Sequence, residues 1–335
     1  MNANPRPRAA LPFGICYRAP CALADDVLAV VRFADAASAT GDAGDITIGL
    51  APLSGDEGDA PAAEIWTSPW PVTRGERKGI AYAHNGEVLF GQLLLREQDY
   101  PALDVAARDG YRRILAFLRR CGYPHALRMW NFFPGINEGD EDTERYKQFS
   151  AGRAGTYEQH ADFERALPAA SAIGSYRPGL LVYFIAARTP GAQIENRRQV
   201  SAFRYPRQYG PKSPSFSRAK LKDWGEGVHL YLSGTASVVG HESLHRHNLN
   251  EQVAEIGRNV RTLIDEAATR DTRLRHCSAR DLDLLRVYLR PLLNTTGVHD
   301  AITREFGDVP RLYLAGDICR QELLVEVEGL LTHSG

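Results

Sequence analysis

The chain has 335 residues, of which 44% are apolar and 24% charged, and its formal net charge is -1. A chain of this length buries a substantial core without disulfides or structural metals, and its charge balance excludes recognition of nucleic acid or anionic membranes through a net positive charge. Because no stretch approaches the roughly 18 apolar residues of a membrane span, and no apolar segment follows Arg6 and Arg8, we expect a cytoplasmic protein that binds a small molecule, with no nucleic-acid or membrane partner.

The first half of the chain is expected to begin irregularly and then to alternate strands and helices. Within residues 1–70 only 45–50 predict a strand, because Pro, Gly, Ala and Asp are frequent and the run 40–63 is especially loose. The Asn85-Gly86 pair predicts a tight hairpin turn. The further elements predicted are a hairpin over 79–95, a helix over 103–121, a strand over 125–133, a helix over 143–166 and a strand over 179–187.

The second half repeats this order of elements. It is predicted to contain a strand over 228–239, a helix over 250–269, a strand over 283–289, a helix over 296–306 and strands over 311–317 and 323–331. We therefore predict an internal duplication and an α+β fold of two halves, 1–190 and 191–335, each with a mixed sheet packed against helices. When the two copies are aligned by their order of elements, Phe184 takes the position of Glu326 in the first copy, or Tyr183 does if the alignment slips by one residue.

Five blocks of the sequence resemble the chorismatase family. They are RMWNFFPGIN (128–137), ERYKQFSAGRAGTY (144–157), YPRQYGPKSPSFSRA (205–219), GTASVVGHES (234–243) and DICRQELLVEVE (317–328). The second half also resembles the Rid/YjgF fold, whose small proteins form trimers with sites between subunits. The resemblance implies two Rid/YjgF-like (chorismate-mutase-like) halves after an irregular N-terminal extension, chorismate as the substrate, and no metal or organic cofactor. Because a duplicated chain can replace two subunits, we expect a monomer.

Chorismate carries two carboxylates, so its site requires cations. Arg153, in a Gly-flanked segment that predicts a ligand-binding loop, and Arg218 are the candidates, because a guanidinium matches the geometry of a carboxylate. Tyr146 and Tyr205 precede these arginines and can hydrogen-bond the same groups. The resemblance carries the substrate-binding Tyr and Arg residues of the family onto these four positions.

Cleavage of the enolpyruvyl ether of chorismate begins with protonation of its methylene carbon, which requires an acid that keeps its proton near neutral pH. Glu326 lies in a mostly apolar strand segment, where burial is expected to raise its pKa. The family pattern also places the catalytic acid at this position. Glu328 points to the same strand face and is the rival candidate.

The step after protonation determines the products. If water enters, chorismate gives pyruvate and a dihydroxy-cyclohexadiene carboxylate, whereas aromatisation of the ring gives pyruvate and a hydroxybenzoate without consuming water. Cys319 and Gly240 resemble the hydroxybenzoate-forming branch of the family, and a small wall at Gly240 beside a soft thiol would exclude water. We therefore expect 3-hydroxybenzoate, with 4-hydroxybenzoate as a further product and hydrolysis as the alternative.

Two other classes of function remain open. Residues 241–245 (HESLH) match the HExxH pattern of zinc hydrolases, with Glu266 as a third ligand, although helical periodicity begins only near Asn250. The five cysteines are odd in number, scattered and without a CxxC pair, which favours reduced thiols over disulfides or a zinc knuckle. A Rid-like protein that binds its ligand without converting it is the other alternative.

Overall fold

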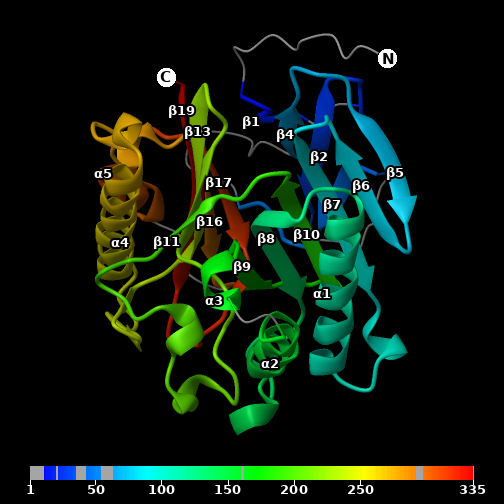
Figure 1. The fold of residues 1–335 in the computed structure, drawn as a ribbon. Coiled ribbons are helices and arrows are strands. Elements are labelled where there is room, and N and C mark those ends of the chain that lie inside the picture. Colours follow the sequence, from blue (N-terminus) through cyan, green and yellow to red (C-terminus); the bar gives the residue numbers. More distant parts are fainter. Residues whose placement is uncertain are drawn as a thin grey trace, which may run out of the picture.

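The computed structural model describes residues 11–19, 22–34, 43–53, 63–159, 162–291 and 297–334. Within these ranges the fold is α+β: two large mixed sheets occupy the centre, and the longer helices cover their outer sides (Figure 1). The predicted fold class is therefore confirmed. The boundary predicted between residues 190 and 191 lies in the connection between the last central strand of the first sheet and the first strand of the second.

The first large sheet has seven strands in the order β18-β9-β8-β10-β7-β6-β5. Their bounds are β5 Thr73–Arg77, β6 Ile80–His84, β7 Val88–Leu95, β8 His125–Phe133, β9 Ala169–Gly174, β10 Leu180–Ala187 and β18 Asp317–Ile318. Helices α1 (Leu103–Arg120) and α2 (Arg145–Tyr157) cover one face, where Ile114 of α1 and Phe149 of α2 share a buried apolar cluster with Val182 of β10. The predicted hairpin, the first helix and the strand at 125–133 are confirmed.

The second large sheet has six strands in the order β11-β12-β13-β19-β16-β17. Their bounds are β11 Ala192–Ile194, β12 Ala219–Asp223, β13 Gly227–Thr235, β16 Leu284–Leu289, β17 Arg311–Ala315 and β19 Val325–Ser334. Helices α4 (Leu249–Arg270) and α5 (Val298–Phe306) cover its outer face, as the apolar periodicity predicted. The short elements are α3 (Phe163–Ala166) and the hairpin of β14 (Val238–Val239) with β15 (Glu242–Ser243).

The two halves share one topology. The order β9-β8-β10-β7-β6 in the first sheet corresponds strand for strand to β17-β16-β19-β13-β12 in the second. In each series the first two strands are parallel and every later pair is antiparallel. Helices α1 and α4 occupy the same place in the order of elements, after the hairpin. This agreement supports the predicted duplication.

The inner faces of the two sheets enclose a common core, and the alternation of side chains decides which residue of β10 matches Glu326. Tyr183 belongs to the cluster between the sheets, whereas Phe184 points outward to the cluster under α1 and α2. In β19, Val325 and Val327 point outward to the helices, so Glu326 faces inward. Of the two candidates, Tyr183 therefore shares the face of Glu326, and the register that places Phe184 there is wrong.

The N-terminal segment is more regular than the sequence predicted. It forms a four-stranded sheet in the order β1-β4-β2-β3, with bounds β1 Gly14–Arg18, β2 Val27–Phe33, β3 Asp45–Ile48 and β4 Ala63–Thr67. Trp66 of this sheet packs on Trp130 and Phe90 of the first large sheet. Only β3 was predicted, and half of the loose run 40–63 lies outside the described residues.

The segment around Gly152 is also more regular than predicted. Residues 145–157 form the helix α2, so the expected ligand-binding loop is wrong. A Cβ at Gly152 would lie 2.0 Å from the carbonyl oxygen of Asp104 at the start of α1. Glycine is therefore required here by the close approach of two helices.

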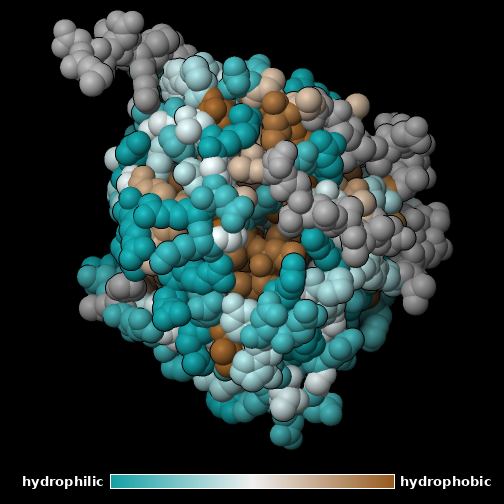
Figure 2. Space-filling model, turned by 90° about the vertical axis from the view of Figure 1, so that its right-hand side faces the viewer, coloured by the Kyte–Doolittle hydropathy of each residue, from teal (hydrophilic) through white to brown (hydrophobic). Residues whose placement is uncertain are grey.

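The molecular surface is mostly hydrophilic. Figure 2 shows the face that carries β5 and α1, where hydrophilic residues predominate and apolar residues are visible in patches between them. Among the described residues, Tyr176 is the one large hydrophobic side chain that is exposed. No helix in the described part of the chain is both long and apolar enough to cross a membrane.

Candidate active site

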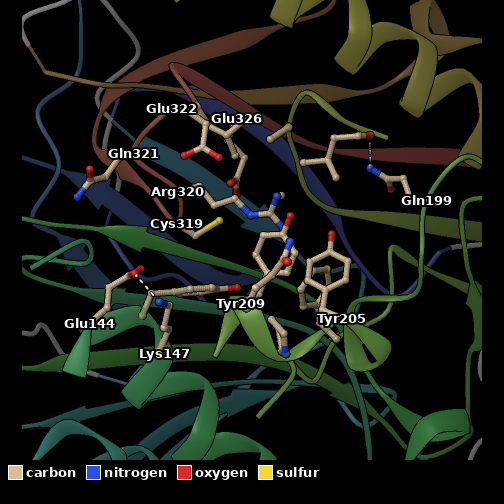
Figure 3. Close-up of a pocket in the computed structure, with 18 of the residues that line it drawn as sticks. Glu144, Lys147, Gln199, Tyr205, Tyr209, Cys319, Arg320, Gln321, Glu322 and Glu326 are labelled. Carbon is tan, nitrogen blue, oxygen red and sulfur yellow. Dashed lines mark hydrogen bonds and ion pairs between the residues drawn. The ribbon is translucent and has the colours of Figure 1, made fainter. Parts of the chain in front are cut away.

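A cavity of about 350 Å³ lies where elements of the two halves meet (Figure 3). Its walls come from the first turn of α2, the segment 199–218, the ends of β13 and β14, the segment 319–323 and the beginning of β19. The cavity is lined by most of the residues predicted for the site, namely Tyr146, Tyr205, Arg218, Cys319 and Glu326. Arg153 and Gly240 do not line it.

Glu326 is the only carboxylic acid of the central strands that reaches this cavity within the described residues. It lies on β19, opposite Tyr288 of β16, and 4% of its surface is exposed. No described group hydrogen-bonds its carboxyl group, so nothing replaces the lost hydration of the charged form. Burial and the nearby charge of Glu328 raise the pKa of Glu326 to about 8. The acid therefore keeps its proton at neutral pH.

Gly234 at the end of β13 lies directly against Glu326. A Cβ on Gly234 would lie 1.8 Å from Oε1 of Glu326 and 3.0 Å from Oγ of Ser171. Any side chain at this position would displace the acid. Gly234 was not predicted as a site residue, although a glycine within a strand is a known signal of close backbone or side-chain approach.

Glu328 points inward from the same strand face but reaches a different environment. Its carboxylate accepts hydrogen bonds from two arginines, a tryptophan, a serine and a tyrosine, which are Arg128, Arg286, Trp130, Ser171 and Tyr288. Burial alone would raise its pKa, but the guanidiniums of Arg128 and Arg286 hold the pKa of Glu328 below its usual range. Glu328 is thus ionised, and its partners leave it no proton to donate.

Arg218 and Tyr205 form one polar wall of the cavity. A nitrogen of Arg218 donates to the hydroxyl oxygen of Tyr205 at 2.6 Å and to the carbonyl oxygen of Val200 at 2.9 Å. The guanidinium carbon lies 5.4 Å from the ring centre of Phe216. Nε of Arg218 is buried without a hydrogen-bond partner, and no described carboxylate forms an ion pair with this side chain.

Arg320 supplies a second cation that the sequence analysis did not select. One of its nitrogens donates to the carbonyl oxygen of His241 at 2.8 Å and to Oγ of Ser243 at 3.0 Å. The guanidinium carbon lies 4.0 Å from the ring centre of Tyr209, and Figure 3 shows Arg320 near Cys319, Tyr205 and Tyr209. Among the described residues neither Arg320 nor Arg218 forms an ion pair with a carboxylate, although burial raises the pKa of the nearby Glu195 and the charge of Arg218 acts against this rise.

Cys319 and Tyr146 are close to the acid and uncharged. Burial and the neighbouring Glu326 raise the pKa of the Cys319 thiol to about 12. Burial, and after it the neighbouring Cys319, hold the pKa of Tyr146 well above its usual value, although the charge of Arg320 acts in the opposite direction. Cys319 also packs on the apolar cluster that contains Ile318 and Leu323. This side of the cavity therefore presents a neutral thiol and a neutral phenol.

Arg153 and Gly240 lie elsewhere. Arg153 is buried within α2, where its guanidinium carbon lies 5.0 Å from the ring centre of Tyr111 and 5.8 Å from that of Tyr157. Its Nε and Nη2 have no hydrogen-bond partner. Gly240 has φ of +59°, and a Cβ there would meet nothing within 4 Å. Neither the expected carboxylate-binding loop nor the expected small wall is found at these positions.

The HExxH segment does not form a zinc-binding helix. Glu242 belongs to the short strand β15, and the helix α4 begins only at Leu249. The ring of His241 contacts the hydroxyl of Tyr209, whereas Nε2 of His245 lies 3.6 Å from a carboxyl oxygen of Glu255. In the described ranges no three His, Cys, Asp or Glu side chains are grouped to hold a metal ion.

The chain is similar to known proteins in sequence and in structure. Residues 64–186 match the family described as "Chorismatase FkbO/Hyg5-like, N-terminal". The chain is 36% identical to a 3-hydroxybenzoate synthase of Streptomyces hygroscopicus, over 81% of this chain and 82% of the relative. It is 34% identical to a chorismatase of Streptomyces rapamycinicus, over 82% of this chain and 83% of the relative. A solved chorismatase structure aligns with 95% of this chain and 98% of its own, with a TM-score of 0.85 and 27% identity.

Proposed function

Since the chain belongs to the chorismatase family, we propose that it converts chorismate to pyruvate and 3-hydroxybenzoate, with Glu326 as the catalytic acid. The observation that supports this proposal is the position of Glu326: a buried carboxyl group with a pKa of about 8 that lines a cavity with two unpaired guanidiniums. A protonated acid beside cations suits a substrate that carries two carboxylates and an acid-labile enol ether.

The acid step follows from this arrangement. Protonated Glu326 donates its proton to the methylene carbon of the enolpyruvyl group, which becomes a methyl group. The bond between the ether oxygen and the ring then breaks, and the oxygen leaves with the electron pair as the carbonyl of pyruvate. The ring loses one proton as it aromatises, and that proton restores the acid. The atoms of chorismate thus divide completely between pyruvate and hydroxybenzoate.

The neutral side of the cavity supports the route without water. Cys319 stays a thiol because its pKa is about 12, and it packs on apolar residues, so it attracts no ordered water as a thiolate would. The ring hydroxyl next to the broken bond then replaces the lost oxygen. Which ring carbon keeps this oxygen distinguishes 3-hydroxybenzoate from 4-hydroxybenzoate, and we propose that the former predominates. Entry of water would give the dihydroxy-cyclohexadiene carboxylate instead.

Arg218 and Arg320 are proposed to bind the two carboxylates. Both are held in place by hydrogen bonds and by aromatic rings, so each loses little freedom when it binds an anion. Tyr205 positions Arg218 through the hydrogen bond to its hydroxyl. The walls of the cavity come from both halves of one chain, so we expect a monomer to contain a complete site.

The test is to incubate the purified protein with chorismate and to identify the products by mass spectrometry. The parent protein should release pyruvate and mainly 3-hydroxybenzoate, and Glu326→Gln should react about 10²- to 10⁴-fold more slowly. Glu326→Gln should still bind chorismate in a calorimetric titration. Unchanged chorismate with the parent would refute the proposed reaction. Equal rates for the parent and Glu326→Gln would refute the role of the acid.

A further inference from the structure

A second cavity, of about 320 Å³, lies between the β5–β6 hairpin and helix α1. It shares no lining residue with the candidate active site. Its cationic residues are Arg77 and Lys78 on the hairpin side and Arg112, Arg113 and Arg120 on the helix side. This cavity is called the basic groove below, and β5 and α1, which border it, lie on the side of the molecule that faces the viewer in Figure 2.

The base of the basic groove is apolar. Ile80 and Phe117, which are 1% and 5% exposed, lie beneath the cations, with Ala116 beside them. An apolar floor between cationic walls fits a ligand with a ring face and charged edges. If these arginines were only solvated at the surface, no buried apolar residues would be needed beneath them.

The charge of the basic groove is only slightly compensated. Asp109 pairs with Arg112 at 2.9 Å and with Arg113 at 3.5 Å. Within the described residues, no carboxylate pairs with Arg77, Lys78 or Arg120, and no acidic residue lines the groove. A chain with a formal net charge of -1 thus concentrates five cations at one hollow.

The hairpin wall of the basic groove is fixed to the helix. Nη2 of Arg113 donates to the carbonyl oxygen of Lys78 at 2.6 Å. Lys78 has φ of +54° and Gly79 φ of +74°, so both residues of this turn adopt the left-handed conformation. Left-handed conformation is unfavourable for lysine, and the hydrogen bond from α1 helps to hold the turn that carries the lysine ammonium to the rim.

We propose that the basic groove binds a small organic dianion with a flat apolar ring. Cations from two opposite walls match two separate anionic groups, and guanidiniums match carboxylates in particular. Its volume is close to the 350 Å³ of the candidate active site, which we assign to a ring dianion on independent grounds. An extended acidic peptide would have little use for an apolar floor of this size. No acidic residue of the described ranges lines the groove, so we assign it a role in binding.

The experiment titrates the full-length protein with benzene-1,3-dicarboxylate by isothermal calorimetry at low ionic strength. The parent protein and every variant carry Arg218→Ala and Arg320→Ala, because the candidate active site is itself assigned to a ring dianion. The double variant Arg77→Ala/Arg120→Ala removes one unpaired cation from each wall. Arg119→Ala is the matched control, because this exposed residue neighbours Arg120 on α1 but does not line the groove. Parent and Arg119→Ala should bind the probe equally, and the double variant should bind it at least about tenfold more weakly. Added salt should weaken binding to the parent protein.

Three outcomes would overturn the proposal. Equal binding by the parent and the double variant would exclude the groove as the site. Equal weakening by Arg119→Ala would indicate a general charge effect of the helix. Tighter binding of a glutamate-rich hexapeptide than of the dicarboxylate, lost in the double variant, would assign the groove to an acidic protein segment instead. Binding is measured without turnover, so the result does not depend on whether Glu326 acts on chorismate.

Discussion

Glu326 and Glu328 lie two residues apart on the inner face of β19, yet one is held neutral and the other ionised. Glu326 meets a cavity and has no hydrogen-bond partner among the described groups, so its pKa is about 8. Glu328 meets two guanidiniums, and its pKa is below the usual range. Where the surroundings raise the pKa of one carboxyl group and lower that of its neighbour, the first typically acts as the acid and the second as a fixed negative charge.

The rate of chorismate conversion should therefore fall as the pH rises through about 8. The active form carries the proton on Glu326, and a raised pKa means that this form persists to that pH and is lost above it. We expect kcat/KM to be level near neutral pH and to fall about tenfold for each pH unit well above 8. Circular dichroism at each pH should confirm that the fold is intact. A rate that increases through pH 8 would require a deprotonated group in place of the acid.

Replacing Glu328 with Gln should move this decline to lower pH. The charge of Glu328 raises the pKa of Glu326, whereas Arg128 lowers it, and the substitution removes the first effect and leaves the second unopposed. It also leaves Arg128 and Arg286 without their shared carboxylate, which we expect to cost about 3–5 kcal/mol of stability. A pH-rate profile and a urea titration measure the two effects. A destabilised variant with an unchanged profile would limit Glu328 to a structural role.

The elements that the sequence predicted well are those whose signals are local. Helices α1 and α4 have long amphipathic patterns, and the turn at Asn85-Gly86 is encoded by two adjacent residues. The N-terminal sheet was missed because its pairing is distant: β1 pairs with β4, and no short turn joins them. The role of Gly152 was misinterpreted because the glycine is required by a contact with another helix, at the carbonyl oxygen of Asp104.

The residues of the site also divide into those with a local signal in the sequence and those without one. Glu326 was predictable, since an acid in an apolar strand is visible in one line of sequence. Gly234 was not selected because its contact with Glu326 joins two strands that are distant in the chain. Arg320 directly follows Cys319 and lies close to the expected acid in β19, so its place in the sequence could have indicated that it belongs to the site. The location of Arg153 under α1 depends on how α2 packs, which no local pattern reports.

Gly234→Ala should inactivate the enzyme while Gly240→Ala should not. A methyl group at Gly234 would lie 1.8 Å from Oε1 of Glu326, so the acid must move, and a displacement near 1 Å can cost about 10²-fold in rate. Gly240→Ala meets no neighbour but places alanine at φ of +59°, which costs about 1 kcal/mol of stability. Steady-state rates and product ratios distinguish the two. If Gly240→Ala alone changed the product, this result would support the predicted small wall at Gly240.

Cys319→Ala should increase the hydrolysis product relative to hydroxybenzoate. The smaller side chain leaves room for water beside Glu326, on the side of the cavity that the neutral thiol fills. Cys319→Ser is the matched control because it keeps nearly the same volume and changes mainly the polarity. Chromatography of the products from chorismate measures the ratio. If both variants still yield mainly hydroxybenzoate, the thiol does not exclude water.

Arg320→Ala should raise KM for chorismate about 10- to 100-fold, with a smaller effect on kcat. The guanidinium is held by the carbonyl of His241 and by the ring of Tyr209, so it offers a preformed carboxylate site whose loss removes one charge-assisted contact. Arg320→Lys keeps the charge without the fork and should recover part of the affinity.

Arg153→Met tests whether a substrate carboxylate binds at Arg153, the position that was predicted from the sequence. Arg153 lies outside the cavity, so its replacement should leave KM for chorismate unchanged. Its stability should also change little, because the cation-π contacts with Tyr111 and Tyr157 are lost while the buried, unpaired Nε and Nη2 are removed, and these effects oppose each other at about 1–2 kcal/mol each. Steady-state kinetics and thermal unfolding measure the two quantities. An increase in KM for Arg153→Met that matches the one for Arg320→Ala would mean that the substrate carboxylate reaches Arg153 through a rearrangement of α2.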